Sequence, residues 1–188
     1  MAKARKKSPA RNKPLDAVAL LKADHRQVEE WFEQFEKARN GERKQKLATQ
    51  ICNALKVHTQ IEEEIFYPAF LQETHDLSLH HEAEVEHDGA KKLIAQIEDS
   101  SPDDEYFDAK VKVLSEMIKH HVKEEEQPGG MFAEAKKADM DLDELGGRLA
   151  ARKAELEAET ADEDDDGAIP AARGRDRPNA GRLAKTSR

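Results

Sequence analysis

The sequence His58-Thr-Gln-Ile-Glu-Glu-Glu64 returns in slightly altered form as His121-Val-Lys-Glu-Glu-Glu126. In each copy a histidine is followed four residues later by a glutamate, Glu62 in the first and Glu125 in the second. Residues four apart are neighbours on one face of an α-helix, with about 5–6 Å between their Cβ atoms. The two copies therefore predict two helices that each present an imidazole and a carboxylate side by side.

A further histidine precedes each copy at a similar distance. His25 lies 33 residues before His58, and His87 lies 34 residues before His121. Imidazole and carboxylate groups are ligands that iron and similar divalent metals accept. The repeated pattern therefore predicts a two-metal site built from two helical hairpins.

Apolar residues at alternating spacings of three and four surround these side chains and predict four amphipathic helices. We expect them to cover residues 14–39 (before Asn40-Gly41), 42–70, 80–97 and 103–126. Pro68 should kink or end the second helix, and residues 71–79 should form a loop. Short connections between four helices favour an all-α, up-down-up-down four-helix bundle.

Each predicted helix carries one histidine on its apolar stripe, where an imidazole is costly to bury unless something binds it. With about 1.5 Å of rise per residue, the four histidines fall within a few turns of one level of the bundle. Two metal ions would satisfy all of these buried groups at once. Structural zinc usually prefers closed sites with cysteine, of which this chain has only Cys52. The candidate metal ligands are His25, His58, Glu62, His87, His121 and Glu125.

Over about residues 15–135 the chain resembles the hemerythrin-like, or HHE cation-binding, domain family. The resemblance rests on the ligand spacing and on neighbouring sequence: Asp24-His25-Arg26, Ile61-Glu-Glu-Glu-Ile-Phe-Tyr-Pro68, Glu86-His87-Asp88, and Met131-Phe132 after the second copy. It implies a four-helix bundle with a non-haem di-iron centre. In that family Glu62 and Glu125 would be bridging carboxylates, and the four histidines would be terminal ligands.

The function that we expect is the binding or sensing of dioxygen, nitric oxide or iron at this centre. The alternative is a di-iron enzyme that decomposes peroxide or acts as a small oxidase in stress defence. Oxygen-carrying hemerythrins have a fifth histidine one turn before the third-helix ligand, where this chain has Ala83. Glu84, Glu86, His80 or a water could take that place, and the sequence leaves the choice open. More carboxylate there would favour oxidised iron over simple reversible oxygen carriage.

Other polar and aromatic side chains receive structural interpretations. We expect a solvated position for His120, near Glu124, and for four glutamates: Glu63, Glu64, Glu124 and Glu126. Five aromatic residues should lie in the core and limit water at the metals: Trp31, Phe32, Phe35, Phe66 and Tyr67. Met131 and Phe132 should fold back as an apolar plug over the end of the bundle.

Composition bounds the remaining possibilities. The 188 residues suffice for one domain with a real core, and 38% charged with 5% aromatic residues is typical of amphipathic helices with solvated tails. A net charge of −9 disfavours nucleic acid as the main partner. The apolar runs are too short to cross a bilayer, so we expect no membrane partner. The start lacks the apolar segment of a signal peptide, and one cysteine allows no internal disulfide; both favour the cytoplasm.

We expect four segments along the chain. They are a disordered basic tail (1–14), the metal-binding bundle (15–138), a short helix (139–160), and a disordered tail that is acidic and then basic (161–188). In the short helix Leu142, Leu145 and Leu149 should face inward, and Gly146-Gly147 should interrupt it. The tails should solubilise the chain or contact a protein partner that the sequence does not identify.

Overall fold

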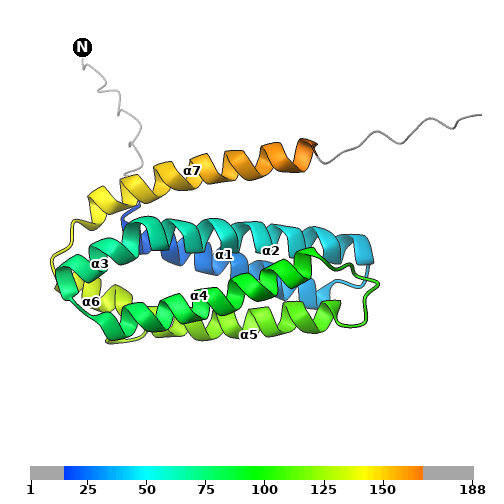
Figure 1. Cartoon of the computed structure of the whole chain (residues 1–188), viewed down its shortest axis with the longest axis horizontal. Coiled ribbons are helices and arrows are strands. Elements are labelled where there is room, and N and C mark those ends of the chain that lie inside the picture. The colour runs from blue at the N-terminus through cyan, green and yellow to red at the C-terminus, as the bar shows by residue number, and fades with distance from the viewer. Residues whose placement is uncertain (1–14, 167–188) are drawn as a thin grey trace, which may run out of the picture.

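The computed structural model describes residues 15–166, with side chains described up to residue 160, and the regular elements in this part of the chain are helices. Four long helices run alternately up and down in one bundle (Figure 1). They are α1 (Ala17–Lys37), α2 (Gly41–Ile61), α4 (Leu77–Glu98) and α5 (Phe107–Glu126). The predicted all-α four-helix bundle is confirmed. The tails predicted at 1–14 and beyond residue 166 lie outside the described residues.

Side-chain caps stabilise the starts of the first two long helices. Asp16 accepts a hydrogen bond from the Ala19 N–H (2.8 Å) at the start of α1, and Asn40 accepts one from the Arg43 N–H (3.2 Å) at the start of α2. Such caps satisfy amide groups that a helix start leaves unpaired. The link between the two helices is therefore short, and α1 and α2 pack as antiparallel neighbours.

The second long helix continues further than predicted and widens at the first His–Glu unit. α2 passes into a π-helical turn, η1 (Glu62–Phe66), and then into α3 (Tyr67–Thr74). The Tyr67 N–H donates to the Glu62 carbonyl, one residue further back than in an α-helix. Of the kink or end predicted at Pro68, the end did not occur, because the chain stays helical past Pro68 to Thr74.

The connections on both sides of α4 also differ from prediction. Residues 71–79 do not form a loop, because α3 reaches Thr74 and α4 begins at Leu77. His75 takes a left-handed conformation (φ 55°) and turns the chain within two residues. Before α5, the Asp104 carboxylate accepts a hydrogen bond from the Ser101 N–H (2.7 Å). The resulting turn delays the start of α5 from the predicted residue 103 to Phe107.

Two further helices close the structure. α6 (Met131–Lys137) carries Met131 and Phe132, which are buried at the end of the bundle as predicted. α7 (Leu142–Asp166) lies along the outside of α1 and α2 (Figure 1). It runs unbroken through Gly146-Gly147, so the predicted interruption of this helix was wrong. A Cβ on Gly146 would meet the Leu15 carbonyl oxygen at 2.3 Å; this glycine therefore serves close packing of α7 on the start of α1.

The core consists of two apolar clusters with a polar layer between them. One cluster includes Leu21, Ile61 and Ala83 near α3, α6 and α7, and the other includes Val28, Leu55 and Ala90 toward the opposite end. On α1, α2 and α4 a buried histidine lies between residues of the two clusters, and on α5 His121 follows the buried residues of the second cluster. The helices of the described part lack the combination of length and apolarity that crossing a membrane requires.

Candidate metal centre

The polar layer contains all six side chains predicted as metal ligands. His25 comes from α1, His58 from α2, His87 from α4 and His121 from α5, and each is at most 5% exposed. Glu62, at the start of η1, is 0% exposed, and Glu125, in the last turn of α5, is 2% exposed. Because ionised carboxylates are buried only where partners compensate them, this layer is built to hold positive charge.

The four histidines form two pairs that face each other through Nε2. The two nitrogens lie 3.0 Å apart in the pair His25–His58 and 3.2 Å apart in the pair His87–His121. Two nitrogens that each lie about 2.1 Å from one ion, at right angles, are separated by about 3 Å. Each pair therefore has a spacing that fits two ligands of one metal ion.

Each glutamate touches one histidine of both pairs. Oε2 of Glu62 lies 3.3 Å from Nε2 of His58 and 3.5 Å from Nε2 of His87. Oε2 of Glu125 lies 3.3 Å from Nε2 of His25 and 3.7 Å from Nε2 of His121. Two groups of donors, His25–His58–Glu62 and Glu62–His87–His121, each have their ligand atoms within 4.8 Å of one another. Glu62 belongs to both groups, which is the arrangement that a bridging carboxylate requires.

The π-helical turn gives the three consecutive glutamates three different environments. Glu62 points into the polar layer, Glu63 contacts Nδ1 of His87 (2.9 Å), and Glu64 pairs with Arg152 of α7 (2.8 Å). π-Helical turns often occur at functional sites, where they redirect side chains. Here the π-helical turn begins at Glu62, a candidate metal ligand.

Every histidine also turns its second ring nitrogen, Nδ1, toward a carboxylate outside the pairs. The four contacts are His25–Glu126 (2.9 Å), His58–Asp24 (3.5 Å), His87–Glu63 (2.9 Å) and His121–Glu86 (2.8 Å). Carboxylates in this position fix the orientation and the tautomer of a metal-binding imidazole. We call Asp24, Glu63, Glu86 and Glu126 the outer carboxylates.

The outer carboxylates correct several sequence interpretations. Glu63 and Glu126 do not form a solvated face, because each binds a buried histidine of a neighbouring helix. Glu86 lies at Nδ1 of His121, on the outer side of that ring. His120 is exposed as predicted but pairs with Glu86 (3.3 Å) rather than with Glu124. Each outer carboxylate is next to a candidate ligand in the sequence, and this adjacency could have indicated that it lies near the metal centre.

Sequence reasoning missed Tyr67. Its hydroxyl oxygen lies 3.2 Å from Nε2 of His87, 3.3 Å from Oε1 of Glu125 and 3.4 Å from Oε2 of Glu62. Burial, and then the charges of the two glutamates, raise the pKa of Tyr67 well above its usual value. The phenol therefore stays protonated. Tyr67 follows Glu62 by five residues, and the π-helical turn brings residues at that spacing to one face.

His80 and Glu84, which the sequence left as possible replacements for the histidine absent at Ala83, lie apart from the six. Nδ1 of His80 is 3.5 Å from Oε2 of Glu84, and the His80 ring meets the edge of the Tyr67 ring, with 6.0 Å between centroids. With His81 they form a separate, partly exposed donor group. Neither His80 nor Glu84 joins the six candidate ligands, whereas the Tyr67 hydroxyl contacts three of them.

The electrostatics of the layer also fit a bound cation. Burial acts to lower the pKa of His58, but Glu62 and Asp24 overcome it and raise that pKa to about 10. Burial acts to raise the pKa of Glu62, but His58, His87 and His121 lower it to about 2. Oε1 of Glu62 and Oε2 of Glu125 are buried without a hydrogen-bond partner in the described part of the chain. Metal ions would supply the charge and the missing contacts, so these residues fit a metal centre.

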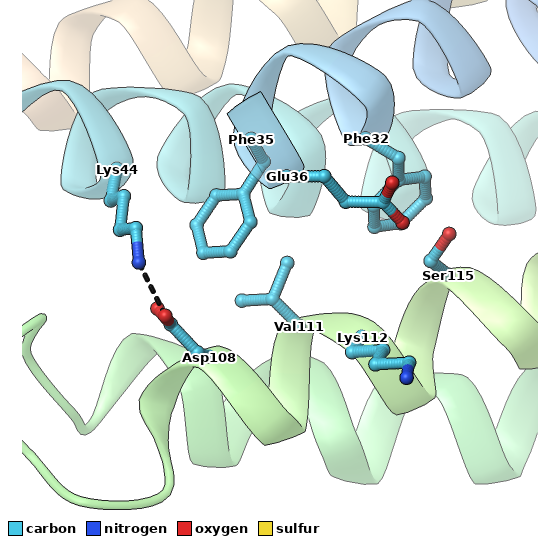
Figure 2. A pocket seen from close by; sticks show the side chains of 8 residues that line it. All are labelled: Phe32, Phe35, Glu36, Lys44, Asp108, Val111, Lys112 and Ser115. Carbon is cyan, nitrogen blue, oxygen red and sulfur yellow. Dashed lines mark hydrogen bonds and ion pairs between the residues drawn. The ribbon is translucent and has the colours of Figure 1, made fainter. Parts of the chain in front are cut away.

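A small cavity adjoins the histidines. It has a volume of about 10 Å³ and is lined by the four histidines together with apolar side chains that include Val28, Leu55, Ile118 and Val122. About one water-sized molecule fits in such a space. A larger groove of about 310 Å³ between α1 and α5 shares His25, Ile118 and Val122 with this cavity. A second hollow of about 350 Å³ lies further along the same two helices, where none of the six candidate ligands lines it (Figure 2).

Fold and side chains define a metal-binding four-helix bundle, and comparison with known families agrees. The chain belongs to the hemerythrin HHE cation-binding domain family, whose sequence model matches residues 16–128. α6 and α7 lie beyond the matched residues. The family predicted from the sequence is thereby confirmed.

Two known proteins show how far the similarity extends. The crystal structure of a hemerythrin HHE cation-binding domain-containing protein, the Rv2633c homolog from Mycobacterium kansasii, superposes with a TM-score of 0.69 and 21% identity. The superposition covers 82% of this chain and 95% of that one, which shows a shared fold. A DNA nickase from Nostoc sp. (strain PCC 7120) is 28% identical over 110 residues, or 57% of this chain. The match covers 30% of the nickase, less than a third of its length.

Proposed function

We propose that this metal-binding protein holds two iron ions and binds or senses a small molecule, dioxygen or nitric oxide, in the cytoplasm. The observation that carries the proposal is the pairing of four histidines into two facing pairs, with two carboxylates that each contact both pairs. In this proposal His25 and His58 hold one ion, His87 and His121 hold the other, and Glu62 and Glu125 bridge them.

The donor set supports iron. It consists of imidazole and carboxylate, which suit non-haem iron, and the one cysteine, Cys52, is buried among the apolar residues of the core. Six side chains do not fill the coordination shells of two six-coordinate ions. Positions therefore remain for solvent, for the Tyr67 hydroxyl and for a small molecule. When bound, the two irons supply the redox chemistry and an open ligand position.

The surroundings support a small ligand. The cavity at the histidines holds about one water-sized molecule and has apolar walls, so it suits a diatomic molecule better than an organic substrate. Val28, Leu55 and Ile118 exclude bulk water from this space. The Tyr67 hydroxyl, which keeps its proton, can donate a hydrogen bond to a ligand beside Glu62 and Glu125.

A second candidate function is an enzyme that decomposes peroxide or acts as a small oxidase. Tyr67 favours it, because a protonated hydroxyl within reach of both glutamates can donate a hydrogen bond to a bound peroxide and orient it.

Metal analysis and spectroscopy together test the proposal. Protein purified without added iron should contain two iron ions per chain. Its reduced form should bind nitric oxide or dioxygen with an absorption change that reverses on removing the gas, whereas rapid peroxide turnover without a lasting change would favour the enzyme. Zinc as the resident metal, or a single ion per chain, would contradict the di-iron proposal.

A further inference from the structure

Two consecutive residues of α7 reach back to the bundle with ion pairs of similar length. Nε of Arg152 lies 2.8 Å from Oε2 of Glu64, and Nζ of Lys153 lies 2.5 Å from Oδ1 of Asp24. Both pairs tie α7 to the helices that carry the metal centre. They differ in what the carboxylate touches next: Glu64 contacts Gln60 (2.7 Å), whereas Asp24 faces Nδ1 of His58 (3.5 Å).

The position of Asp24 therefore depends on α7. Its side chain is 15% exposed and uses one oxygen for Lys153 and the other for His58. At 3.5 Å, Nδ1 of His58 is close to Asp24 yet makes no hydrogen bond within the described part of the chain. A small movement of this carboxylate would bring it within hydrogen-bond distance of Nδ1 of His58 or take it further away.

Asp24 differs from the other outer carboxylates in the origin of its cation. Glu126 pairs with Lys22 and Arg26 of α1, and Glu63 pairs with Lys91 of α4. Glu86 contacts His120 of α5. These partners all come from the bundle itself. Lys153 comes from the added helix, beyond the residues that the family model matches.

We propose that Lys153 is a positioning residue of the metal centre: by clamping Asp24 against His58, it couples the docking of α7 to metal binding. The inference rests on the proposed function of the centre. Coupling between two binding events is reciprocal, so a metal held by His58 also strengthens the docking of this part of α7.

α7 does not need Lys153 in order to stay in place. Leu145, Leu149 and Leu156 are buried in the same apolar cluster as Val57, the neighbour of His58. Arg152 and Glu64 provide a second tie. Beside Lys153, a cavity of about 360 Å³ separates this part of α7 from α1 and α2, and Asp24 and Trp31 line it. Because solvent reaches the Lys153–Asp24 pair, the pair adds little to stability, and its effect lies in the position of the carboxylate.

The first test compares the rate at which a chelator removes iron from the purified, loaded protein. Lys153→Met keeps the aliphatic stem and removes the charge. It should speed iron release by roughly three- to tenfold, less than the 10–100-fold that the loss of an outer partner itself can cause. Asp24→Asn should act at least as strongly, the double variant should add little to it, and Lys153→Arg should restore most of the wild-type rate. Arg152→Met, the matched control, should leave the rate unchanged.

The second test measures the reverse coupling by amide hydrogen exchange over residues 142–160, with and without bound metal. Metal should slow exchange around residue 153 in the wild type and in Arg152→Met, but not in Lys153→Met. The fluorescence of Trp31, the one tryptophan of the chain, should report the same difference.

Two results would overturn the role of Lys153: wild-type behaviour of Lys153→Met in both tests, or equal effects of Arg152→Met, which would make docking alone the cause. Repeating both tests with Co²⁺ separates this inference from the proposed function. A protein that rejects iron but shows the Lys153 effect with Co²⁺ would contradict the di-iron proposal alone.

Discussion

The Tyr67 hydroxyl oxygen lies 3.2 Å from Nε2 of His87, within the layer of candidate ligands rather than beside it. The two rings also stack, with 5.4 Å between their centroids and 30° between their planes. Tyr67 therefore supports His87 through its ring and offers the centre a protonated oxygen through its hydroxyl. These two roles can be separated by removing the oxygen alone.

Tyr67→Phe keeps the ring and removes the hydroxyl. We expect the variant to bind the same amount of iron and to lose about 1 kcal/mol of unfolding free energy with the hydrogen bonds. If the hydrogen bond of the hydroxyl orients a bound peroxide, peroxide turnover should fall roughly 100-fold. Tyr106→Phe is the matched control, since Tyr106 is the other tyrosine and is 65% exposed. Unchanged peroxide chemistry and unchanged spectra in Tyr67→Phe would show that the hydroxyl is only structural.

Glu62 contacts a histidine of both pairs, so its loss should affect both metal ions. Glu62→Ala should lose most of the bound iron, and His58→Ala should lose at least the ion of its own pair. Ligation stabilises the folded state. With free iron at about 100 times Kd, the unfolding free energy of the wild type should therefore be roughly 3 kcal/mol larger than that of these variants. Metal analysis and urea unfolding measure both effects.

His120→Ala is the control for the ligand variants. His120 precedes a candidate ligand in sequence, yet its side chain is 60% exposed and pairs with the outer carboxylate Glu86 rather than with the six candidate ligands. Its removal should leave the iron content unchanged and alter stability by less than about 0.5 kcal/mol. Full iron content in Glu62→Ala, or clear iron loss in His120→Ala, would mean that the ligands are assigned wrongly.

The adjacent glycines of α7 should respond to alanine in opposite directions. A Cβ on Gly146 would lie 2.3 Å from the Leu15 carbonyl oxygen, whereas a Cβ on Gly147 would meet nothing within 4 Å. Gly146→Ala should therefore push α7 away from α1 and cost roughly 1–3 kcal/mol. Gly147→Ala should stabilise the helix by up to about 1 kcal/mol, since alanine is the better helix former. Thermal unfolding of the two variants checks the pair, and a stabilising Gly146→Ala would contradict the close packing.

Periodicity made the bundle and the polar layer predictable. Alternating spacings of three and four located the buried stripe of each long helix, and a histidine on every stripe indicated one shared centre. The same counting failed at η1, because it assumes 3.6 residues per turn and the chain adds one residue there. Tyr67, five residues after Glu62, was therefore assigned to the core.

The outer carboxylates were missed for a different reason. Asp24 contacts Nδ1 of His58, and Glu126 contacts Nδ1 of His25, so each carboxylate reaches across a helix–helix interface. Spacing along one helix cannot reveal such contacts. Gly146 presents the same difficulty: its local preference predicts a break, but packing of α7 against α1 makes a residue without a Cβ the one that fits. Tertiary contacts decided both cases.

The stability of the metal-free protein should depend on pH through His58 and Glu62. The pKa of His58 is raised from 6.5 to about 10 in the folded protein, so its stabilising effect is complete below pH 6.5 and disappears as the pH rises toward 10. The pKa of Glu62 is lowered from 4.5 to about 2, so its effect is present above pH 4.5 and disappears as the pH falls toward 2. This pair therefore favours the metal-free fold most between about pH 4.5 and 6.5.

Metal binding should offset the loss of stability above pH 6.5. An imidazole must lose its proton to ligate a metal, so iron should bind more tightly as the pH rises above 6.5 and should offset the stability that the metal-free protein loses. Urea unfolding of the metal-free and loaded proteins at several pH values measures both slopes. In metal-free His58→Ala the decline between pH 7 and 10 should be smaller. A metal-free wild type that grew more stable over that range would show that the buried histidines are neutral, and that Glu62 and Asp24 do not hold a proton on His58.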